Sequence, residues 1–358
     1  MNEGQQRSDA SPVLPAEGQV VPDAATLNRA AARLLSGGLV AFPTETVYGL
    51  GGDAENPEAL ARIYEVKGRP SNHPVIVHVA PDADLSYWVR SVPEEARLLM
   101  HAFWPGPLTL ILPRAAHINP AVSGGQDSIG LRCPSHPVAQ ALLRRFAALK
   151  GGHGGVAAPS ANKFGQVSPT QATHVRNEFP ELDEDNLLVL EGGSSEVGIE
   201  STIVDISRLE DGVGPVLLRP GHISAEALGK VLGRMPTRPD AAAPRVSGSL
   251  KAHYAPRTPL QLVERSQLRA QIDVAAALGE RIALATFPPL FDLGQPDATR
   301  VHRVECPLDP VQYARRLYAL LRELDEGGYD RILLERPPAE TAWQAVNDRL
   351  GRAAAAFE

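Results

Sequence analysis

The stretch ENPEALARIYEVKGRPSNHPVIVHVA, residues 55–80, carries a helix signal followed directly by a strand signal. Asn56 is a preferred N-cap residue, and Pro57 suits the first position of a helix. The apolar residues that follow recur on one helical face, namely Leu60, Ile63 and Tyr64. Pro70 ends this pattern, and PVIVHVA then has the length and composition of a buried strand. The stretch therefore predicts a helix that packs against a strand.

The same alternation of helix and strand signals extends in both directions from this stretch. A helical pattern runs from Asp23 to about Ser36, and two more occur in PEEARLLMHAFWP and HPVAQALLRRFAALK. Short apolar runs with Gly or Pro at their ends lie around them: GGLVAF, LTLILP, SIGLRCP, GVAAPS, NLLVLEGG, STIVDIS and PVLLRPG. The pattern predicts an α/β fold, in which helices cover a twisted open sheet.

A long segment without periodicity divides the chain. Residues 229–258 are rich in Pro, Gly and small residues, which predicts a linker. Beyond it, strand signals in LQLVE, RIALATF and RILLERP alternate with helical patterns and predict a smaller α/β domain with a parallel sheet. The polar start of the chain predicts a disordered tail. The predicted organisation is a tail at 1–22, a first domain at 23–228, the linker at 229–258 and a second domain at 259–358.

Length and composition limit the class of protein. The 358 residues suffice for two domains, and the net charge of −7 disfavours a large basic surface for nucleic acid. The two cysteines, Cys133 and Cys306, have no CxxC partner, so we predict neither a disulfide framework nor a zinc cluster. No apolar run reaches the roughly 18 residues of a membrane span, and the chain start lacks the apolar core of a secretory signal. We expect a cytoplasmic protein that does not enter a membrane.

Polar and charged residues lie at or near the ends of the predicted strands of the first domain. Ligands of open α/β sheets bind beyond the carboxyl ends of strands, so these residues are candidates for a binding site. Each has an ordinary alternative: cations at a helix end complement its dipole, small hydroxyl residues favour turns, and a buried Arg forms an ion pair. Together, the hydroxyl residues and four cations predict a site for an anionic, phosphate-bearing ligand. The cations are Lys67, Arg69, Arg132 and Arg219.

Several familiar site motifs are missing from the sequence. It contains no GxxxxGK[ST], no GxGxxG after a strand, no HExxH and no GxSxG. We therefore expect neither a P-loop nor a dinucleotide fold, and no nucleophilic triad. Cys133 follows Arg132, which favours a thiolate, but no other feature of a cysteine enzyme accompanies it.

Seven motifs occur in order across residues 42–221: FPTETVYGLGG, KGRPSNHPVIVHV, WPGPLTLIL, GLRCPSHPVA, APSANKFGQVSPT, GIESTIVD and LLRPG. In this combination they resemble the YrdC family of threonylcarbamoyl-AMP synthases. The linker motif SGSLKAHYAP and the small α/β domain after it resemble the longer, two-domain Sua5 form, in which the C-terminal domain is Rossmann-like. The resemblance covers nearly all of the chain after the tail.

The resemblance implies a nucleotidyltransferase that makes L-threonylcarbamoyladenylate and releases pyrophosphate. Its substrates would be L-threonine, bicarbonate or CO2, and ATP accompanied by Mg2+. The product would serve the formation of N6-threonylcarbamoyladenosine (t6A) at position 37 of tRNA, through a separate TsaD/Kae1-type transferase. Whether tRNA touches this protein directly is left open.

The family's functional residues can be carried over to the matching motif positions of this chain. The implied threonine contacts are Thr46, His78, Arg132 and Ser201. The implied ATP contacts are Lys67, which would face the phosphates, and Arg69, His73, Ser128, Ser160, Ser168, Arg219 and Tyr254. The family often has Asn where this chain has His73. No protein ligand for the metal is implied, since Mg2+ can be shared between phosphates and water.

No general base or covalent nucleophile stands out among these residues. We therefore expect catalysis by positioning and by stabilisation of charge. As a hypothesis, the threonine nitrogen captures CO2 or bicarbonate as a carbamate, and a carbamate oxygen then attacks the α-phosphorus. Because such a carbamate is unstable in water, Tyr254 in the linker is our candidate for a lid.

Two other functions fit part of the pattern. The same cation-lined surface would suit RNA, with Phe164 and Tyr48 as candidates for base stacking. A carbamoyl-transfer enzyme of the hydrogenase-maturation type also contains a YrdC-like domain. Such chains add acylphosphatase and zinc-finger segments, for which this chain has neither the length nor the cysteines. The oligomeric state and the role of the C-terminal domain stay open.

Overall fold

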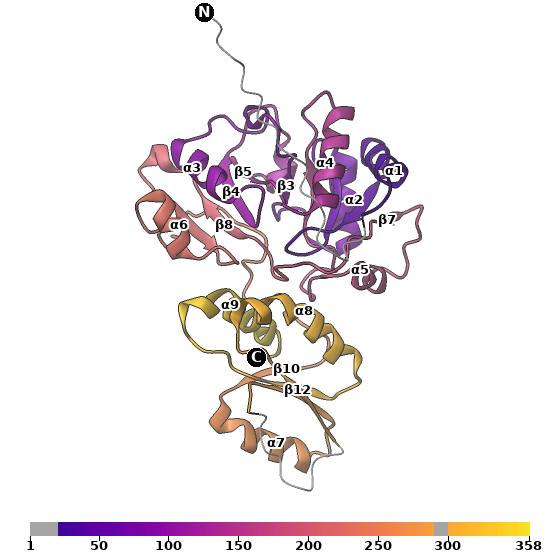
Figure 1. Ribbon diagram of the computed structural model, residues 1–358, viewed down its shortest axis with the longest axis vertical. Coiled ribbons are helices and arrows are strands. Elements are labelled where there is room, and N and C mark those ends of the chain that lie inside the picture. Colours follow the sequence, from indigo (N-terminus) through magenta and orange to yellow (C-terminus); the bar gives the residue numbers. More distant parts are fainter. Residues whose placement is uncertain (1–20, 290–299) are drawn as a thin grey trace, which may run out of the picture.

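The computed structural model describes residues 21–289 and 300–358. Two α/β domains follow one another along the long axis of the molecule, with the linker between them in sequence (Figure 1). The predicted disordered tail falls, except for residues 21 and 22, outside the described residues. Within the described ranges, no helix is both long and apolar enough to cross a membrane.

The first domain is built on a mixed sheet of nine strands in the order β7-β1-β2-β6-β3-β5-β4-β8-β9. The strands are β1 Leu39–Phe42, β2 Gly49–Asp53, β3 Ile76–His78, β4 Leu108–Pro113, β5 Ser128–Arg132, β6 Val156–Ala157, β7 Leu187–Val189, β8 Thr202–Asp205 and β9 Val216–Arg219. The helices are α1 Ala24–Leu35, α2 Pro57–Lys67, α3 Glu94–Phe103, α4 Pro137–Leu149, α5 Ala172–Glu178 and α6 Ala225–Leu232. The predicted α/β class is confirmed.

The stretch at residues 55–80 folds as its sequence indicates. The side chain of Asn56 caps α2 by accepting from two backbone N–H groups, and Pro57 is the first helical residue. Gly68 ends the helix in the left-handed conformation, with φ of 61°. That sharp end places Lys67 and Arg69 on either side of the turn. The strand β3 follows, and its central residue Val77 is fully buried.

Helices cover both faces of this sheet, but one face only in part. Side chains of α2, α3, α5 and α6 belong to the hydrophobic cluster on one face. On the opposite face, α1 and α4 pack together over a second cluster that includes Phe42 and Val156. Further along this face, no helix within the described residues contributes to the cluster of Ile111 and Ile203, on which Val246 of the linker packs. The linker therefore takes the place of a covering helix.

Strand directions decide where polar strand ends can meet. β1 and β6 run in one direction, whereas β3, β5 and β9 run in the other. Their carboxyl ends consequently point to opposite ends of the sheet, measured along the strand direction. The rule that a ligand binds beyond one common set of strand ends holds for parallel strands and does not apply to this mixed sheet. Residues from these ends can share a site only across the face of the sheet.

The boundaries of the linker differ from the predicted ones. Helix α6 continues to Leu232, so the predicted boundary between residues 228 and 229 falls inside it. Gly229 within this helix makes its sequence resemble the segment that follows. From residue 233 to residue 259 the chain forms only isolated bridges, which join Thr237 to Val216 and Ala255 to Gln166. Both bridges attach the linker to the first domain.

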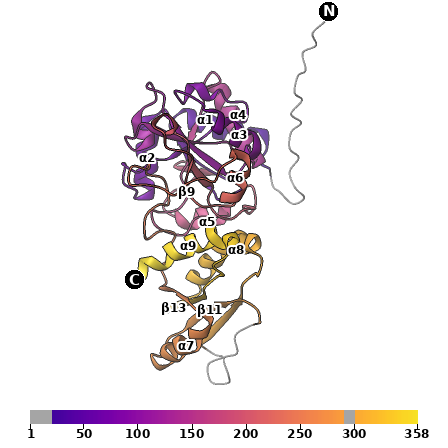
Figure 2. The ribbon, with the colours of Figure 1, turned by 90° about the vertical axis from the view of Figure 1, so that its left-hand side faces the viewer.

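The C-terminal domain has a four-stranded sheet in the order β10-β13-β11-β12, and all its pairs are parallel as predicted. The strands are β10 Leu260–Val263, β11 Ile282–Thr286, β12 Val301–Glu305 and β13 Arg331–Glu335. The helices are α7 Leu268–Ala277, α8 Pro310–Glu326 and α9 Gln344–Ala354. Helices α8 and α9 lie between this sheet and the first domain, and α7 lies on the far side (Figures 1 and 2). β12 was not predicted, because charged residues interrupt its short apolar pattern.

The two domains pack closely against each other. One hydrophobic cluster contains Val47, Val167 and Ile199 of the first domain together with residues of α8 and α9. At Gly198 the backbone of α8 passes so near that an added Cβ would overlap Arg315 Cα. Gly198 also has φ of 81°, which a side chain disfavours. The C-terminal domain is therefore seated directly on the loop that leads into β8.

Candidate active site

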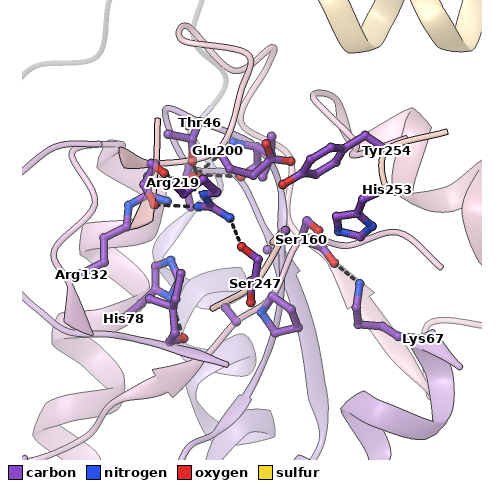
Figure 3. A pocket seen from close by; sticks show the side chains of 18 of the residues that line it. Thr46, Lys67, His78, Arg132, Ser160, Glu200, Arg219, Ser247, His253 and Tyr254 are labelled. Atoms are coloured by element: carbon purple, nitrogen blue, oxygen red, sulfur yellow. Dashed lines mark hydrogen bonds between the residues drawn. The ribbon is translucent and has the colours of Figure 1, made fainter. Parts of the chain in front are cut away.

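The polar strand ends of the first domain converge on a cavity of about 50 Å³ between the sheet and the linker. The lining comes from strands, from the end of α2, from the loop before β8 and from the linker (Figure 3). Its charged and hydroxyl-bearing residues include Thr44, Thr46, Lys67, Arg69, His78, Arg132, Ser160, Glu200, Ser201, Arg219, Ser247 and Tyr254.

Arg132 is held in place by a buried ion pair. Its Nη2 donates to Glu45 Oε1 at 2.6 Å, and both side chains are 5% exposed. The other oxygen of Glu45 accepts from the backbone N–H of Ser135 at 3.1 Å. Arg132 Nε is buried and has no hydrogen-bond partner among the described residues. The guanidinium is thus fixed by Glu45 on one side and keeps a donor for a ligand.

His78 lies beside Arg132, because β3 and β5 pair these two residues in register. Burial, and next the charge of Arg132, lower the pKa of His78 to about 3. The imidazole is therefore neutral near pH 7. Across the cavity lining, Thr46 Oγ1 lies 2.9 Å from Thr44 Oγ1, so a pair of hydroxyl groups faces the same space.

Lys67 and Arg69 are both buried in the cavity wall. Lys67 Nζ donates to the carbonyl oxygens of Ser160 at 2.6 Å and Asn162 at 2.5 Å. Arg69 Nη2 donates to Ser247 Oγ at 3.0 Å, whereas its buried Nε has no partner within the described residues. Burial, with the charge of Arg69 next, lowers the pKa of Lys67 well below its usual value. Burial also lowers the pKa of Arg69, to about 10, so this residue keeps its charge.

Arg219 joins the sheet to the linker. Its Nε donates to the carbonyl oxygen of Ser201 at 3.0 Å, and its Nη2 donates to Ser201 Oγ at 3.1 Å. Its Nη1 donates to the carbonyl oxygen of Ser247 in the linker at 2.9 Å. Ser201 Oγ also lies 2.7 Å from Thr109 Oγ1. One guanidinium thereby fixes the start of β8 and the linker segment above it.

The linker presents an aromatic pair to the cavity. His253 and Tyr254 lie on the side away from Arg132 and His78 (Figure 3). Tyr254 is 1% exposed, and its hydroxyl group has no hydrogen-bond partner among the described residues. A Cβ added at Gly248 would overlap that hydroxyl group, so only glycine fits there. Burial lowers the pKa of His253 to about 3.

Three predicted contacts lie outside the cavity lining. Ser128 opens β5, at the opposite end of that strand from Arg132. Ser168 is fully buried and donates to Glu200 Oε1 at 2.6 Å, so it supports a lining residue. His73 packs edge-on against Phe164, which itself lines the cavity, with ring centroids 5.3 Å apart. The other nine predicted site residues all belong to the lining: Thr46, Lys67, Arg69, His78, Arg132, Ser160, Ser201, Arg219 and Tyr254.

Two carboxylates near the cavity were not predicted, Glu45 and Glu200. Both lie inside quoted motifs, PTET and GIEST, and both are buried. Burial alone raises the pKa of Glu200, but the attraction of Arg349 and Arg219 outweighs it and lowers that pKa to about 2. One feature of the sequence could have identified them: each is an acidic residue within a motif whose other polar residues suit binding of an anion. Such a residue needs a buried cation as partner.

The structure argues against Cys133 as a nucleophile and against Tyr48 and Phe164 as residues that stack on RNA bases. Burial raises the pKa of the Cys133 thiol to about 12, so this residue is no nucleophile near pH 7. Tyr48 is fully buried and donates to the carbonyl oxygen of Gly193, which leaves no face for base stacking. Phe164 is engaged by His73. The described residues contain no cluster of three or more His, Cys, Asp or Glu side chains arranged for a metal ion.

Fold and site define a two-domain α/β protein with a cation-lined cavity that its interdomain linker covers. Residues 32–221 match the family model Sua5_yciO_yrdC, described as telomere recombination, and residues 223–355 match the model for the threonylcarbamoyl-AMP synthase C-terminal domain. The chain is 36% identical to a threonylcarbamoyl-AMP synthase of Pyrococcus abyssi, covering 90% of this chain and 92% of that protein. It is 38% identical to one of Bacillus subtilis, covering 91% and 92%.

A solved structure has the same two-domain arrangement. The crystal structure of Pyrococcus abyssi Sua5 complexed with L-threonine superposes with a TM-score of 0.80 at 33% identity, over 92% of this chain and 94% of that one. The chain belongs to the Sua5/YrdC family of threonylcarbamoyl-AMP synthases, in its two-domain form.

Proposed function

We propose that this protein makes L-threonylcarbamoyladenylate from L-threonine, bicarbonate or CO2, and ATP, and releases pyrophosphate. The observation that carries the proposal is the set of unpaired buried groups around the cavity. Nine buried side-chain N or O atoms lack a hydrogen-bond partner among the described residues, and four of them belong to lining residues. These four are on Arg69, Arg132, His253 and Tyr254. Buried polar groups without partners are costly, so they mark positions that a polar ligand satisfies.

Arg132 is the proposed partner of the threonine carboxylate. A guanidinium that Glu45 already orients loses little side-chain entropy when it binds a second carboxylate. His78 is neutral beside it, so it adds no repulsion and can exchange a hydrogen bond with threonine. The hydroxyl groups of Thr46 and Ser201 line the same cavity and suit the amino and hydroxyl groups of threonine. A threonine-bound relative, Sua5 of Pyrococcus abyssi, supports this assignment.

Lys67, Arg69 and Arg219 are the proposed partners of the nucleotide phosphates. All three are buried, where charge-assisted hydrogen bonds to phosphate are strong. The low pKa of Lys67 reflects burial beside Arg69, and an approaching phosphate would favour its charged form. Ser160 offers a hydroxyl group in the same wall, and His73 with Phe164 lies beside it. Ser128 and Ser168 do not line the cavity, so this proposal gives them no direct contact with the nucleotide.

Mg2+ enters this proposal as part of the ATP complex. The cavity wall is rich in cations, and Glu200, its buried carboxylate, is already paired with Arg349. This donor set suits phosphate oxygens and leaves the metal to the phosphates and water. When bound, the metal neutralises phosphate charge and makes pyrophosphate a better leaving group.

The reaction needs two bond-forming steps. The threonine ammonium group first loses a proton to solvent, and the free amine adds to CO2 (from bicarbonate by loss of water) and loses a second proton to give a carbamate. A carbamate oxygen then attacks the α-phosphorus of ATP, and the bond to pyrophosphate breaks. Arg132 holds the amino acid, while the buried cations stabilise the charge that develops on the phosphates. No residue needs to act as a nucleophile, which agrees with the inert thiol of Cys133.

The linker must move for substrates to enter. A cavity of about 50 Å³ has room for a few water molecules but lies well below the roughly 300–1,000 Å³ of most ligand sites. Tyr254 and Ser247 close it in the structure, so we propose that their segment opens for ATP and closes again over the intermediate. Closure excludes water from the carbamate and the adenylate. The product would then pass to a TsaD/Kae1-type transferase that modifies tRNA, with or without direct contact between tRNA and this protein.

The first test is release of pyrophosphate by the purified protein with ATP and Mg2+ in the absence of tRNA. Threonine and bicarbonate are omitted in turn, in CO2-depleted buffer for the second omission. We expect release that requires both. Release that ignores threonine would overturn the proposed acceptor, and a folded protein that binds ATP without releasing pyrophosphate would overturn the synthase function.

A further inference from the structure

An arginine of the C-terminal domain reaches a carboxylate in the cavity wall of the first domain. Arg349 in α9 has a side chain with no exposed surface, and its Nε donates to Glu200 Oε2 at 2.8 Å. Its Nη2 donates to the backbone carbonyl oxygen of Glu200 at 3.3 Å. Tyr318 of α8 donates to the same carboxylate oxygen at 2.8 Å. Two helices of the C-terminal domain therefore hold one residue of the cavity wall.

Glu200 connects Arg349 and Tyr318 to residues that line the cavity. It precedes Ser201, whose carbonyl and hydroxyl oxygens both accept from Arg219. The attraction of Arg219 also acts directly on the Glu200 carboxylate. If Arg349 were removed, Arg219 would be the nearest remaining counter-charge of a buried carboxylate. It would then be drawn from Ser201 and Ser247, which it holds in the closed arrangement.

The same guanidinium supports the aromatic residue of the linker. Arg349 Cζ lies 5.3 Å from the centre of the Tyr254 ring, which is cation–π geometry. Among the described residues, Tyr254 is the single non-glycine residue with positive φ, at 61°. Such a conformation persists where its surroundings determine it. Helix α9 determines these surroundings further, because the N–H of His253 donates to the carbonyl oxygen of Arg352 at 3.1 Å.

We infer that Arg349 is a positioning residue of the active site, which orients Glu200 and Tyr254 and makes the C-terminal domain part of the catalytic unit. The inference rests on the proposed function. Glu200 and Tyr254 line the cavity whereas Arg349 does not, so Arg349 would touch no substrate. Its loss should therefore lower kcat through a poorly closed site. Threonine binding should change less than kcat, since Arg132, the proposed partner of the threonine carboxylate, is held separately by Glu45.

The test compares Arg349→Met and Arg349→Lys with Arg322→Met. Arg322 makes a matched ion pair across the same domain boundary, with Glu178 at 2.9 Å and side chains 11% and 7% exposed, but it does not line the cavity. We expect Arg349→Met to lower kcat at least about thirtyfold, with the Kd for threonine changed less than threefold. Arg349→Lys should recover part of the loss, and Arg322→Met should stay within threefold of wild type.

A pH profile separates positioning from general loss of structure. In Arg349→Met the pKa of Glu200 must rise, so the deficit relative to wild type should shrink as pH falls and the carboxylate takes up a proton. The double variant Glu200→Gln/Arg349→Met should lack this pH dependence. The titratable groups that face Glu200 in the native protein are Arg219, Arg349, Tyr254, Tyr318, Lys67 and His253.

Hydrogen exchange of residues 247–255 supplies a readout that does not depend on turnover. This segment should exchange faster in both Arg349 variants than in Arg322→Met. Equal kcat losses in Arg349→Met and Arg322→Met, a deficit that is flat with pH, or unchanged exchange would overturn the inference. A wild-type protein that releases no pyrophosphate in the same assay would instead defeat the proposed function and the inference with it.

Discussion

The carboxyl ends of β5 and β13 offer a direct comparison between the two domains. β5 ends in Arg132, which is paired with Glu45 but keeps a buried Nε without a partner among the described residues. β13 ends in Glu335, whose two oxygens accept from Arg265 Nη1 at 3.1 and 3.0 Å, and one of them also accepts from the N–H of Phe287 at 2.9 Å. Both strand ends are polar and buried, yet only the first has an unsatisfied polar atom on a residue that lines the cavity.

The difference teaches how to separate a ligand site from a structural ion pair. Parallel α/β sheets place polar residues at strand ends in general, so polarity there is weak evidence. A buried donor that stays unpaired next to a cavity is stronger evidence. Its desolvation costs free energy on folding, and no hydrogen bond within the protein offsets that cost. The C-terminal sheet shows no such donor at its described strand ends. The C-terminal domain instead contacts the cavity wall through its helices, where Arg349 of α9 and Tyr318 of α8 donate to Glu200.

The largest expected effect is a conservative change at Arg132. Arg132→Lys loses the planar fork that holds Glu45 and a carboxylate together. We expect kcat/KM for threonine to fall about 100-fold, which corresponds to about 3 kcal/mol of transition-state stabilisation. The matched change in the C-terminal domain, Arg265→Lys, should leave turnover within twofold. Equal losses from the two changes, measured as threonine-dependent pyrophosphate release, would erase the comparison.

A change at Gly198 tests how tightly the two regions depend on each other. Gly198→Ala puts a Cβ into the backbone of α8 at a residue with positive φ. We expect it to lower the free energy of unfolding by about 1–3 kcal/mol, through overpacking. Urea denaturation followed in both domains measures the effect. Gly193→Ala is the control, because that residue also has positive φ but meets no atom within 4 Å. A loss of unfolding free energy no larger than that of the control would show that α8 moves to accommodate the added methyl group.

The linker residue Tyr254 should affect retention of the product more than binding of threonine. Tyr254→Ala removes the ring that closes the cavity, and we expect about a tenfold loss of kcat with earlier escape or hydrolysis of the adenylate. Separation of AMP from the intact intermediate after single turnover measures this. Full activity with full retention of the intermediate would rule out the proposed closure.

The last expected effect is a difference in acid sensitivity between the domains. His78 and His253 have pKa values lowered by burial to about 3, below the value of about 6.5 in an unfolded chain. As pH falls from 6.5 toward 3, the unfolded state binds protons that the folded state does not. The free energy of unfolding then falls by at most about 1.4 kcal/mol per pH unit for each histidine.

The C-terminal domain has one histidine, His302, and it is exposed. Hydrogen exchange at pH 5 should therefore show loosening in the first domain before the second. His78→Asn should make the decline of stability between pH 6.5 and 5 shallower than in wild type. An identical decline in this variant would mean that His78 takes up its proton while the protein is still folded.

The sequence by itself determined the features that are encoded over short distances. The N-cap Asn56, the helix α2 and the strand β3 follow from about twenty residues, because capping, helical periodicity and apolar runs are local. The motifs likewise predicted the family and nine of the lining residues, most of which lie next to a strand, whereas Lys67 and Arg69 lie at the end of α2 and Tyr254 in the linker. The strand β2 escaped, because its sequence GLGGD has low strand propensity and depends on pairing with β1 and β6.

The tertiary structure alone decided which charges are paired and where the cavity lies. Glu45 and Arg132 are 87 residues apart in sequence, and Glu200 and Arg349 are 149 residues apart. No local pattern specifies such partners, because the attraction acts only after the sheet and the two domains have assembled. Because β1 and β3 run in opposite directions, the polar residues at their carboxyl ends meet across the face of the sheet. Strand direction is a property of the whole fold, which residues at one strand end do not encode.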